Sequence, residues 1–252
     1  MNVTIESKIL PPTDVPDSFD SAHDRGDLSL VFQPIRPIGS SLNDEADYFE
    51  ALLRVKEVSP ITFLDRLSPQ DYFKLDLWIA AQVQELPRQH RYAVNVSSFS
   101  FSNLRFIEML LRSSDQFVLE LTEHRALDLA QSNLLTDICA KFSVMIDDIG
   151  SAHSGLNRLL DFNFRGIKID GHLIMQIAES FKARAIVGGL LRMAEELRIC
   201  CVCECVETIE IWHLLRDIHA AKAPRLELYV QGWGVGLPRK VEMRSGVGLS
   251  LK

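Results

Sequence analysis

Phe142-Ser143-Val144-Met145-Ile146-Asp147-Asp148-Ile149-Gly150 is the stretch of sequence that indicates the fold: an apolar run leads directly into two adjacent carboxylates. Such a run is typical of a strand that is buried on both faces of a parallel sheet. In parallel α/β folds, functional groups gather at the carboxyl ends of the strands, and carboxylate oxygens favour Mg²⁺, Mn²⁺ or Ca²⁺. A plainer interpretation is that one aspartate caps a helix while its neighbour faces solvent.

Other segments carry the same short apolar or alternating pattern, and helical patterns lie between most of them. The predicted strands are Leu28–Ile35, Ala46–Arg54, Arg91–Val96, Phe117–Leu121, Phe142–Ile146, Arg165–Ile169, Ile199–Cys205 and Leu226–Gln231. The predicted helices are Pro69–Leu86, Ala126–Phe142, Gly171–Leu197 and Thr208–Ile218, the last with Thr208 as its N-cap. No helix separates the first two strands, so we expect them to form a hairpin. The sequence therefore predicts a TIM-like (β/α)8 barrel with an irregular, antiparallel first strand.

Composition narrows the class of protein. A net charge of −7 and a pI near 5.5 exclude a general DNA- or RNA-binding surface, which needs an excess of Lys and Arg. No apolar run approaches the roughly 20 residues of a membrane span, and residues 1–6 do not resemble a signal peptide. We therefore expect a cytoplasmic protein. Residues 1–26 are acidic and contain several Pro, so they are predicted to be a flexible segment before a barrel domain at 27–252.

Four of the five cysteines lie in the segment Cys200-Cys201-Val202-Cys203-Glu204-Cys205. Zinc sites usually space paired cysteines by two to four residues, and alternate residues of a strand face opposite ways, so these thiols do not converge on one ion. We interpret them as small apolar residues of a buried strand. A redox sensor is the alternative.

Polar or charged side chains occupy the carboxyl ends of most predicted strands. In a closed barrel these groups point into one mouth, where the carboxylates would repel one another strongly without cations. A site with two divalent metal ions resolves this repulsion, and such sites drive in-line phosphoryl displacement. The residues concerned are Glu50, Asn95, Glu120, Glu123, Asp147, Asp148, Lys168, Asp170, Glu204, Glu207 and Gln231.

These residues also carry a resemblance to a known family. Phe49-Glu50-Ala51-Leu52-Leu53-Arg54 resembles the signature after which EAL domains are named, and Phe32-Gln33-Pro34-Ile35 is similar to an upstream segment of the same family. The later motifs follow in family order, and the likeness covers roughly residues 28–240: Asn95-Val96-Ser97, Glu120-Leu121-Thr122-Glu123, Asp147-Asp148, Lys168-Ile169-Asp170, Glu204-Cys205-Val206-Glu207 and Gln231-Gly232.

The resemblance implies a bacterial phosphodiesterase that hydrolyses cyclic di-GMP to linear pGpG with two Mg²⁺ or Mn²⁺ ions, and that Ca²⁺ inhibits. It implies that Lys168 orients the attacking water, that Glu204 is a metal ligand or general base, and that Glu123 steadies the loop after Asp148. It allows a homodimer and a regulatory protein partner. The implied metal ligands are Glu50, Asn95, Glu120, Asp147 and Asp148, and the implied substrate contacts are Gln33, Leu52, Arg54, Asp170, Gln231 and Pro238.

Several positions depart from the family pattern. The loop after Asp148 reads Ile149-Gly150-Ser151-Ala152-His153, where the family typically has Phe at the first position, Gly at the fourth and an aromatic residue or Asn at the fifth. Ala152 replaces a Gly at a position that is expected to favour positive φ, and Cys205 also stands where the family usually has Gly. These changes bear on turnover and ligand affinity rather than on the fold.

Two other functions remain as alternatives at this stage. An EAL-like receptor would bind cyclic di-GMP or a protein partner with little or no catalysis, and the altered loop favours it. A barrel lyase would use Lys168 to form a Schiff base, but that chemistry gives no reason for so many carboxylates. Because every expected metal-ligand position is retained, the sequence favours the phosphodiesterase.

Overall fold

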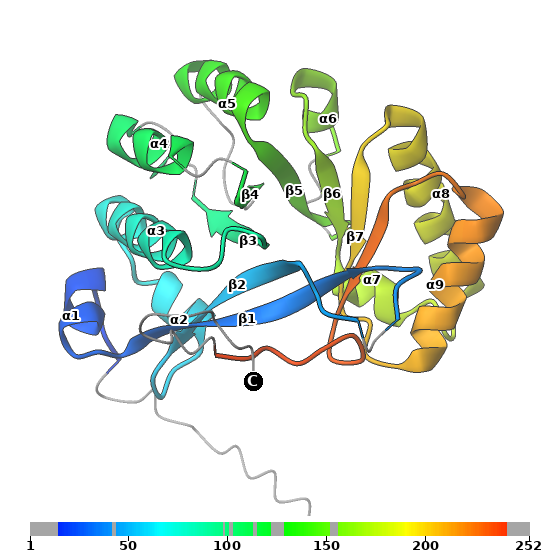
Figure 1. Cartoon of the computed structure of the whole chain (residues 1–252), viewed down its shortest axis with the longest axis horizontal. Helices are drawn as coiled ribbons and strands as arrows, with labels where there is room; N and C mark the ends of the chain where they lie inside the picture. The colour runs from blue at the N-terminus through cyan, green and yellow to red at the C-terminus, as the bar shows by residue number, and fades with distance from the viewer. Residues whose placement is uncertain are drawn as a thin grey trace, which may run out of the picture.

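The computed structural model describes residues 15–41, 44–97, 99–100, 103–112, 115–121, 129–151 and 156–240, and within them eight strands close into a barrel in the order β1 to β8 (Figure 1). The strands are β1 (Leu28–Pro37), β2 (Tyr48–Val55), β3 (Arg91–Val96), β4 (Phe117–Leu121), β5 (Ser143–Ile149), β6 (Gly166–Ile169), β7 (Cys200–Cys203) and β8 (Leu228–Gln231). This confirms the predicted TIM-like barrel.

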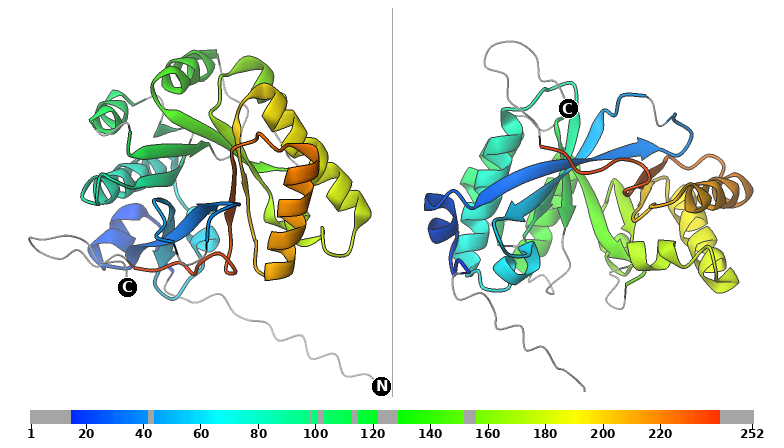
Figure 2. Two further views of the ribbon diagram at one scale, coloured as in Figure 1. Left: turned by 45° about the vertical axis from the view of Figure 1, so that its right-hand side comes forward. Right: turned by 90° about the horizontal axis from the view of Figure 1, so that it is seen from below.

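The first strand runs against its neighbours, as predicted. β1 pairs antiparallel with β2 from Leu28 to Ile35 and with β8 from Ile35 to Pro37, whereas the pairs from β2–β3 to β7–β8 are parallel. The chain beyond β8 returns along β1, where Arg239 pairs antiparallel with Phe32. Figure 2 shows this returning segment beside β1.

Helices surround the parallel part of the barrel (Figure 1). Seven of the described helices begin at side-chain caps that satisfy the free N–H groups of a first turn, among them Ser68 with a capping box at α3, Ser180 at α8, and Thr208 at α9 as predicted. The helices are α1 (Phe19–Asp24), α2 (Pro60–Leu64), α3 (Pro69–Gln84), α4 (Leu104–Leu111), α5 (Leu129–Lys141), α6 (Arg158–Asp161), α7 (Gly171–Met175), α8 (Phe181–Leu197) and α9 (Ile209–Lys222).

The structure corrects two expectations about helices. The single helix predicted at Gly171–Leu197 is two, because the chain leaves α7 at Gln176 and Ser180 caps a new start at α8. The flexible segment predicted at 1–26 does not extend through residues 15–26: α1 lies there, and Phe19 N–H donates to Asp71 Oδ1 at 3.2 Å. An ion pair between Asp20 and Lys74 also ties α1 to α3.

Strand alternation divides the barrel interior into an apolar layer and a polar one. A distinct buried apolar cluster fills one end of the interior; its members are Ile35, Tyr48, Ala93, Val118, Met145, Cys200, Val202 and Tyr229. Side chains two residues apart on a strand share a face. The next inward positions toward the carboxyl end of the parallel strands, and the matching position on the reversed β1, are therefore Gln33, Glu50, Asn95, Glu120, Asp147, Lys168, Glu204 and Gln231.

Three of the four cysteines in residues 200–205 lie in the buried strand β7, whereas Cys205 follows the strand and is half-buried, so the buried-strand interpretation is wrong for Cys205. Cys201 and Cys203 pack in the main core, on the opposite face of β7 from Cys200, and all three are free thiols. Burial raises the pKa of Cys200 to about 11, which disfavours the reactive thiolate. The interpretation of these three residues as small apolar side chains is confirmed.

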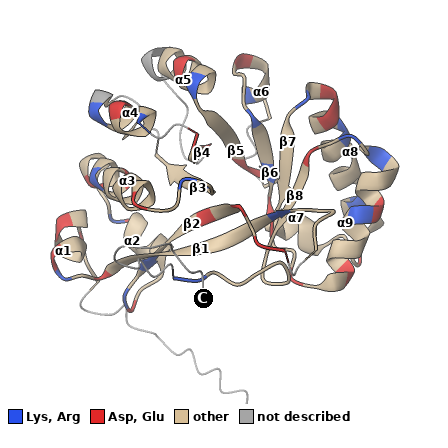
Figure 3. Cartoon of the chain, viewed as in Figure 1, with Lys and Arg blue, Asp and Glu red and all other residues tan. Residues whose placement is uncertain are grey.

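Charged residues lie mainly on the helices and loops outside the barrel (Figure 3). The strands carry few charges: Glu50, Glu120, Asp147 and Lys168 belong to the inner polar layer, whereas Arg36, Arg54, Arg91 and Asp148 do not. None of the helices among the described residues is both long enough and apolar enough to cross a membrane.

Two glycine-to-alanine substitutions test the packing of the barrel. A Cβ on Gly166, inside β6, would lie 2.4 Å from Cys200 Sγ and 2.7 Å from its carbonyl oxygen, so Gly166→Ala should lower the free energy of unfolding by about 1–3 kcal/mol. The control, Gly189→Ala on α8, meets no atom within 4 Å and should raise it by about 0.5–1 kcal/mol. Urea denaturation of both variants checks this, and a Gly166→Ala protein as stable as wild type would contradict the packing.

Candidate active site

The polar layer of the barrel centres on one buried lysine. Lys168 Nζ lies 2.8 Å from Glu204 Oε1 and 3.0 Å from Glu120 Oε2, and 3.5 Å from both Glu50 Oε2 and Asp147 Oδ1. These five residues, the carboxylate–lysine cluster, come from β2, β4, β5, β6 and the residue after β7. The structure thus brings together side chains that are up to 154 residues apart in the chain, from 50 to 204.

The cluster places four carboxyl groups around one ammonium. Burial disfavours the charged form of Lys168, but Asp147, Glu120, Glu204 and Glu50 together raise its pKa well above 10.5, so the ammonium keeps its proton. Burial raises the pKa of Glu120 well above its ordinary value. With four carboxyl groups around a single ammonium, the arrangement favours additional cations.

Amide side chains orient one edge of the cluster. Asn95 Nδ2 donates to Glu50 Oε1 at 3.1 Å, and Gln231 Nε2 donates to Glu50 Oε2 at 2.5 Å and to Gln33 Oε1 at 3.1 Å. Burial opposes ionisation of Glu50, but the charge of Lys168 and these hydrogen bonds lower its pKa below the ordinary value. Glu50 is therefore held as a carboxylate in a fixed orientation.

Two buried oxygens of the layer show that a cation fits there. Glu120 Oε1 and Gln231 Oε1 accept no hydrogen bond from any described residue. A buried acceptor without a partner is costly, and a divalent ion is a partner suited to oxygen atoms of this kind. The donor set of carboxylate and carboxamide oxygens matches that of Mg²⁺ or Mn²⁺.

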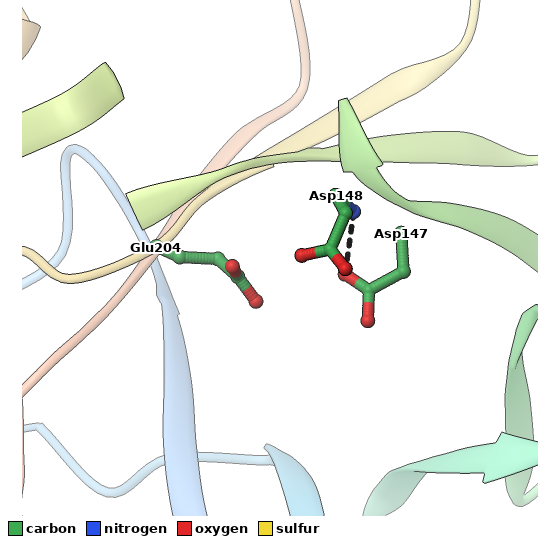
Figure 4. A group of neighbouring side chains, drawn as sticks. All are labelled: Asp147, Asp148 and Glu204. Carbon is green, nitrogen blue, oxygen red and sulfur yellow. Dashed lines mark hydrogen bonds between the residues drawn. The ribbon is translucent and has the colours of Figure 1, made fainter. Parts of the chain in front are cut away.

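Asp148 adds one more carboxylate beside Asp147 and Glu204 of the cluster, at the mouth of the barrel. Single oxygens of Asp147, Asp148 and Glu204 all lie within 4.8 Å of one another, and Figure 4 shows their carboxyl groups directed into one space from β5 and from the segment after β7. Asp148 has φ +57°, unusual for a residue other than Gly, and Asp148 N–H donates to Asp147 Oδ1 at 3.0 Å. The shift in register between β5 and β6 here turns both aspartates toward the mouth.

The remaining predicted residues are not part of this cluster. Leu52 and Arg54 continue the Glu50 face of β2 toward its exposed end, and Pro238 belongs to the segment that returns along β1. Asp170 caps α7 through His172 N–H at 3.0 Å. Glu123, and the altered loop positions Ala152 and His153, lie outside the described residues.

One residue beside the site escaped the sequence analysis. Asp76, on the buried face of α3, accepts hydrogen bonds from the segment that follows β3. Its sequence signal is a carboxylate within an otherwise apolar stripe of a helix.

Comparison with known proteins shows which family the chain belongs to. The sequence model of the EAL domain matches residues 17–234. The chain belongs to the EAL domain family. This assignment confirms the resemblance found in the motifs from Phe49-Glu50-Ala51-Leu52 onward.

Relatives of this EAL chain include two with stated activities. It is 25% identical over 246 residues to the cyclic di-GMP phosphodiesterase PdeB of Shewanella oneidensis, covering 86% of this chain and 27% of PdeB. It is 26% identical over 233 residues to the cyclic di-GMP phosphodiesterase PdeF of Escherichia coli, covering 83% of this chain and 30% of PdeF. The chain thus spans less than a third of the length of these relatives.

Solved EAL structures share the fold. The EAL enzyme Bd1971 in its cAMP-bound form has a TM-score of 0.76 at 22% identity, covering 88% of this chain and 66% of that chain. BlrP1 of Klebsiella pneumoniae, solved with manganese and cyclic di-GMP at pH 6, has a TM-score of 0.70 at 26% identity, covering 84% of this chain and 56% of that chain. The second of these structures therefore combines the fold with a divalent metal ion and the cyclic dinucleotide.

The electrostatics of the cluster predict how stability of the metal-free protein depends on pH. Burial raises the pKa of Glu204 from 4.5 to about 7, so between these values the folded protein holds a proton that the unfolded chain has released. Stability in EDTA should therefore fall as the pH rises from 4.5 to about 7. Glu204→Gln removes one titrating group and should make that dependence less steep, and Asp76, whose pKa burial raises to about 6, contributes to the part that remains.

Urea denaturation in EDTA across this pH range measures the effect. The control is Glu196→Gln on the exposed side of α8, where the carboxylate pairs with Arg192 at 3.0 Å; it should keep the wild-type dependence. An unchanged slope in Glu204→Gln would show that Glu204 does not carry the effect.

Proposed function

We propose that this EAL chain hydrolyses cyclic di-GMP to linear pGpG with two Mg²⁺ or Mn²⁺ ions. The observation that carries the proposal is the carboxylate–lysine cluster at the carboxyl end of the barrel, in a chain whose family includes cyclic di-GMP phosphodiesterases. A Schiff-base role for Lys168 does not suit this site, because carboxylates on every side keep the amine protonated and therefore not nucleophilic.

The inward-facing oxygens divide into groups that would hold the two ions. Asp147 and Asp148 present carboxylates at the mouth, and Glu50, Asn95 and Glu120 present oxygens on the neighbouring strands β2, β3 and β4. When bound, such ions lower the pKa of water and offset charge on phosphoryl oxygens. Gln231 lies beside Glu50, where it fixes the carboxylate orientation.

Lys168 and Glu204 are proposed to orient the attacking water and to accept its proton, respectively. The ammonium of Lys168 keeps its protons, so it can donate a hydrogen bond to the water oxygen and stabilise negative charge as the phosphorus is attacked. Glu204, 2.8 Å from Lys168 Nζ, supplies a carboxylate for the proton that the water loses. The bond that breaks joins phosphorus to the departing 3′-oxygen, which takes up a proton to become the hydroxyl of pGpG.

The proposed substrate contacts include exposed Arg54 on β2 and Gln33 in the buried polar layer. Arg54, exposed near the end of β2, has a guanidinium suited to bidentate contact with a phosphate. Gln33, Leu52, Asp170 and Pro238 complete the proposed contacts, and Glu123 is proposed to steady the loop after β5. Regulation and oligomeric state of the whole protein would then depend on segments outside this site.

Metal dependence is the first test of this function. Purified protein incubated with cyclic di-GMP and Mg²⁺ or Mn²⁺ should form pGpG, EDTA should abolish the reaction, and Ca²⁺ should inhibit it because it prefers larger and looser coordination. Chromatography of the nucleotides measures the product. Full activity in EDTA would refute the metal-dependent mechanism, and tight binding in Ca²⁺ without pGpG in Mn²⁺ would identify a receptor instead.

Isosteric substitutions of ligand carboxylates are the second test. Glu50→Gln and Asp147→Asn should each lower kcat by at least about a hundredfold, since each removes a charged oxygen at the reacting centre. Both should fold in EDTA, because removing one charge from a repelling cluster relieves repulsion. Steady-state kinetics and circular dichroism check the two expectations, with Glu196→Gln as the control. Near-normal turnover in either variant would disprove that ligand assignment.

A further inference from the structure

A buried carboxylate lies next to the site without belonging to it. Asp76 sits on the inner face of α3 among Leu75, Ile79 and Ala80, and it is only 6% exposed. Burying a carboxylate is costly unless hydrogen bonds or charges compensate it. No ion pair joins Asp76 to any described Lys, Arg or His.

Hydrogen bonds from one short segment compensate this carboxylate. Asp76 Oδ2 accepts from Ser97 N–H at 3.0 Å, from Ser97 Oγ at 2.7 Å and from Ser100 Oγ at 2.5 Å. Ser97 and Ser100 also lie 3.3 Å apart through their hydroxyl oxygens. Three donors on one oxygen make a rigid junction between α3 and the chain that leaves β3.

The segment that follows β3 begins shortly after Asn95, a proposed metal ligand. β3 ends at Val96, one residue after Asn95, and Ser97 is the first residue beyond it. Asn95 is paired in the sheet with Glu120 and donates its carboxamide N–H to Glu50 Oε1 at 3.1 Å. An anchor at Ser97 therefore fixes the backbone that sets the direction of the Asn95 side chain. Ser97, the last residue of the Asn95-Val96-Ser97 motif, thus connects the motif to Asp76 on α3.

We propose that Asp76 is a positioning residue that, by anchoring Ser97, holds the Asn95 carboxamide in the orientation required to bind a divalent metal ion beside Glu50 and Glu120. The inference rests on the proposed metal site. Preorganised ligands lose little entropy on binding, and displacing one of them by a fraction of an ångström is enough to weaken a metal site.

Three variants separate anchoring from general stability. Asp76→Ala removes the acceptor oxygen, whereas Asp76→Asn keeps a neutral oxygen that can accept the same bonds. Asp71→Ala is the matched control on the same helix: Asp71 forms the capping box of α3 with Ser68 and accepts from Phe19 N–H, so its loss should lower stability without changing the contacts of β3.

The readout is Mn²⁺ binding by the full chain without substrate, measured by calorimetry, together with hydrogen exchange of the Ser97 amide. Asp76→Ala should weaken Mn²⁺ binding about tenfold, which corresponds to about 1.4 kcal/mol, and should speed exchange at Ser97. Asp76→Asn should stay within about threefold of wild type, and Asp71→Ala should bind Mn²⁺ as wild type does.

Unchanged Mn²⁺ affinity in a destabilised Asp76→Ala protein would overturn the inference and leave Asp76 as a structural residue. If Asp76→Ala does not fold, the Ser97→Ala and Ser100→Ala double variant is measured instead. It keeps the backbone N–H of Ser97 as a donor to Asp76 and should weaken Mn²⁺ binding about threefold. Wild-type affinity in the double variant would refute the proposed role of the Asp76–Ser97 contact. Because binding is measured without substrate, failure of the wild-type protein to form pGpG would refute the proposed function and leave this comparison intact.

Discussion

The attraction between the Lys168 ammonium and the carboxylates around it is the interaction on which the site depends. Lys168 and Glu120 are both almost completely buried, so neither can rely on water for solvation. Each ion pair compensates part of the cost of burial, yet one ammonium cannot neutralise four carboxyl groups. At the open end of the barrel, the folded chain thus has fewer positively charged groups than carboxyl groups.

The rest of the fold can be understood as support for that arrangement. An apolar layer containing Tyr48, Met145 and Tyr229 fills one end of the barrel, and the polar layer lies next to it on the side of the mouth. Tyr48 OH contacts Met145 Sδ at 3.7 Å across the interior. Because the polar layer rests on packed side chains rather than on water, its charges interact in a medium of low dielectric constant, where both attraction and repulsion are strong.

Much of this was predictable from sequence, for identifiable reasons. The barrel was predicted from the period of two along each strand. The convergence of Glu50, Glu120 and Lys168 was predicted from the polar strand ends, because the carboxyl ends of parallel strands meet at one end of a barrel. The break between α7 and α8 was not predicted, because the apolar period runs through Ile177 without interruption. Asp76 was overlooked because its partners, on another element, are invisible in the local pattern.

The reversed direction of β1 has a consequence for how the site comes into being. Gln33 and Gln231 touch through a hydrogen bond although 198 residues separate them, and Ile35 pairs with Gln231 to close the barrel. Contacts between such distant parts of a chain lose the most conformational entropy and tend to form late in folding. Glu50, held by Gln231, therefore reaches its final orientation only when the first and last strands meet. A chain still being synthesised, or one opened at this seam, lacks the arrangement we propose for catalysis, so activity would report completion of the whole barrel.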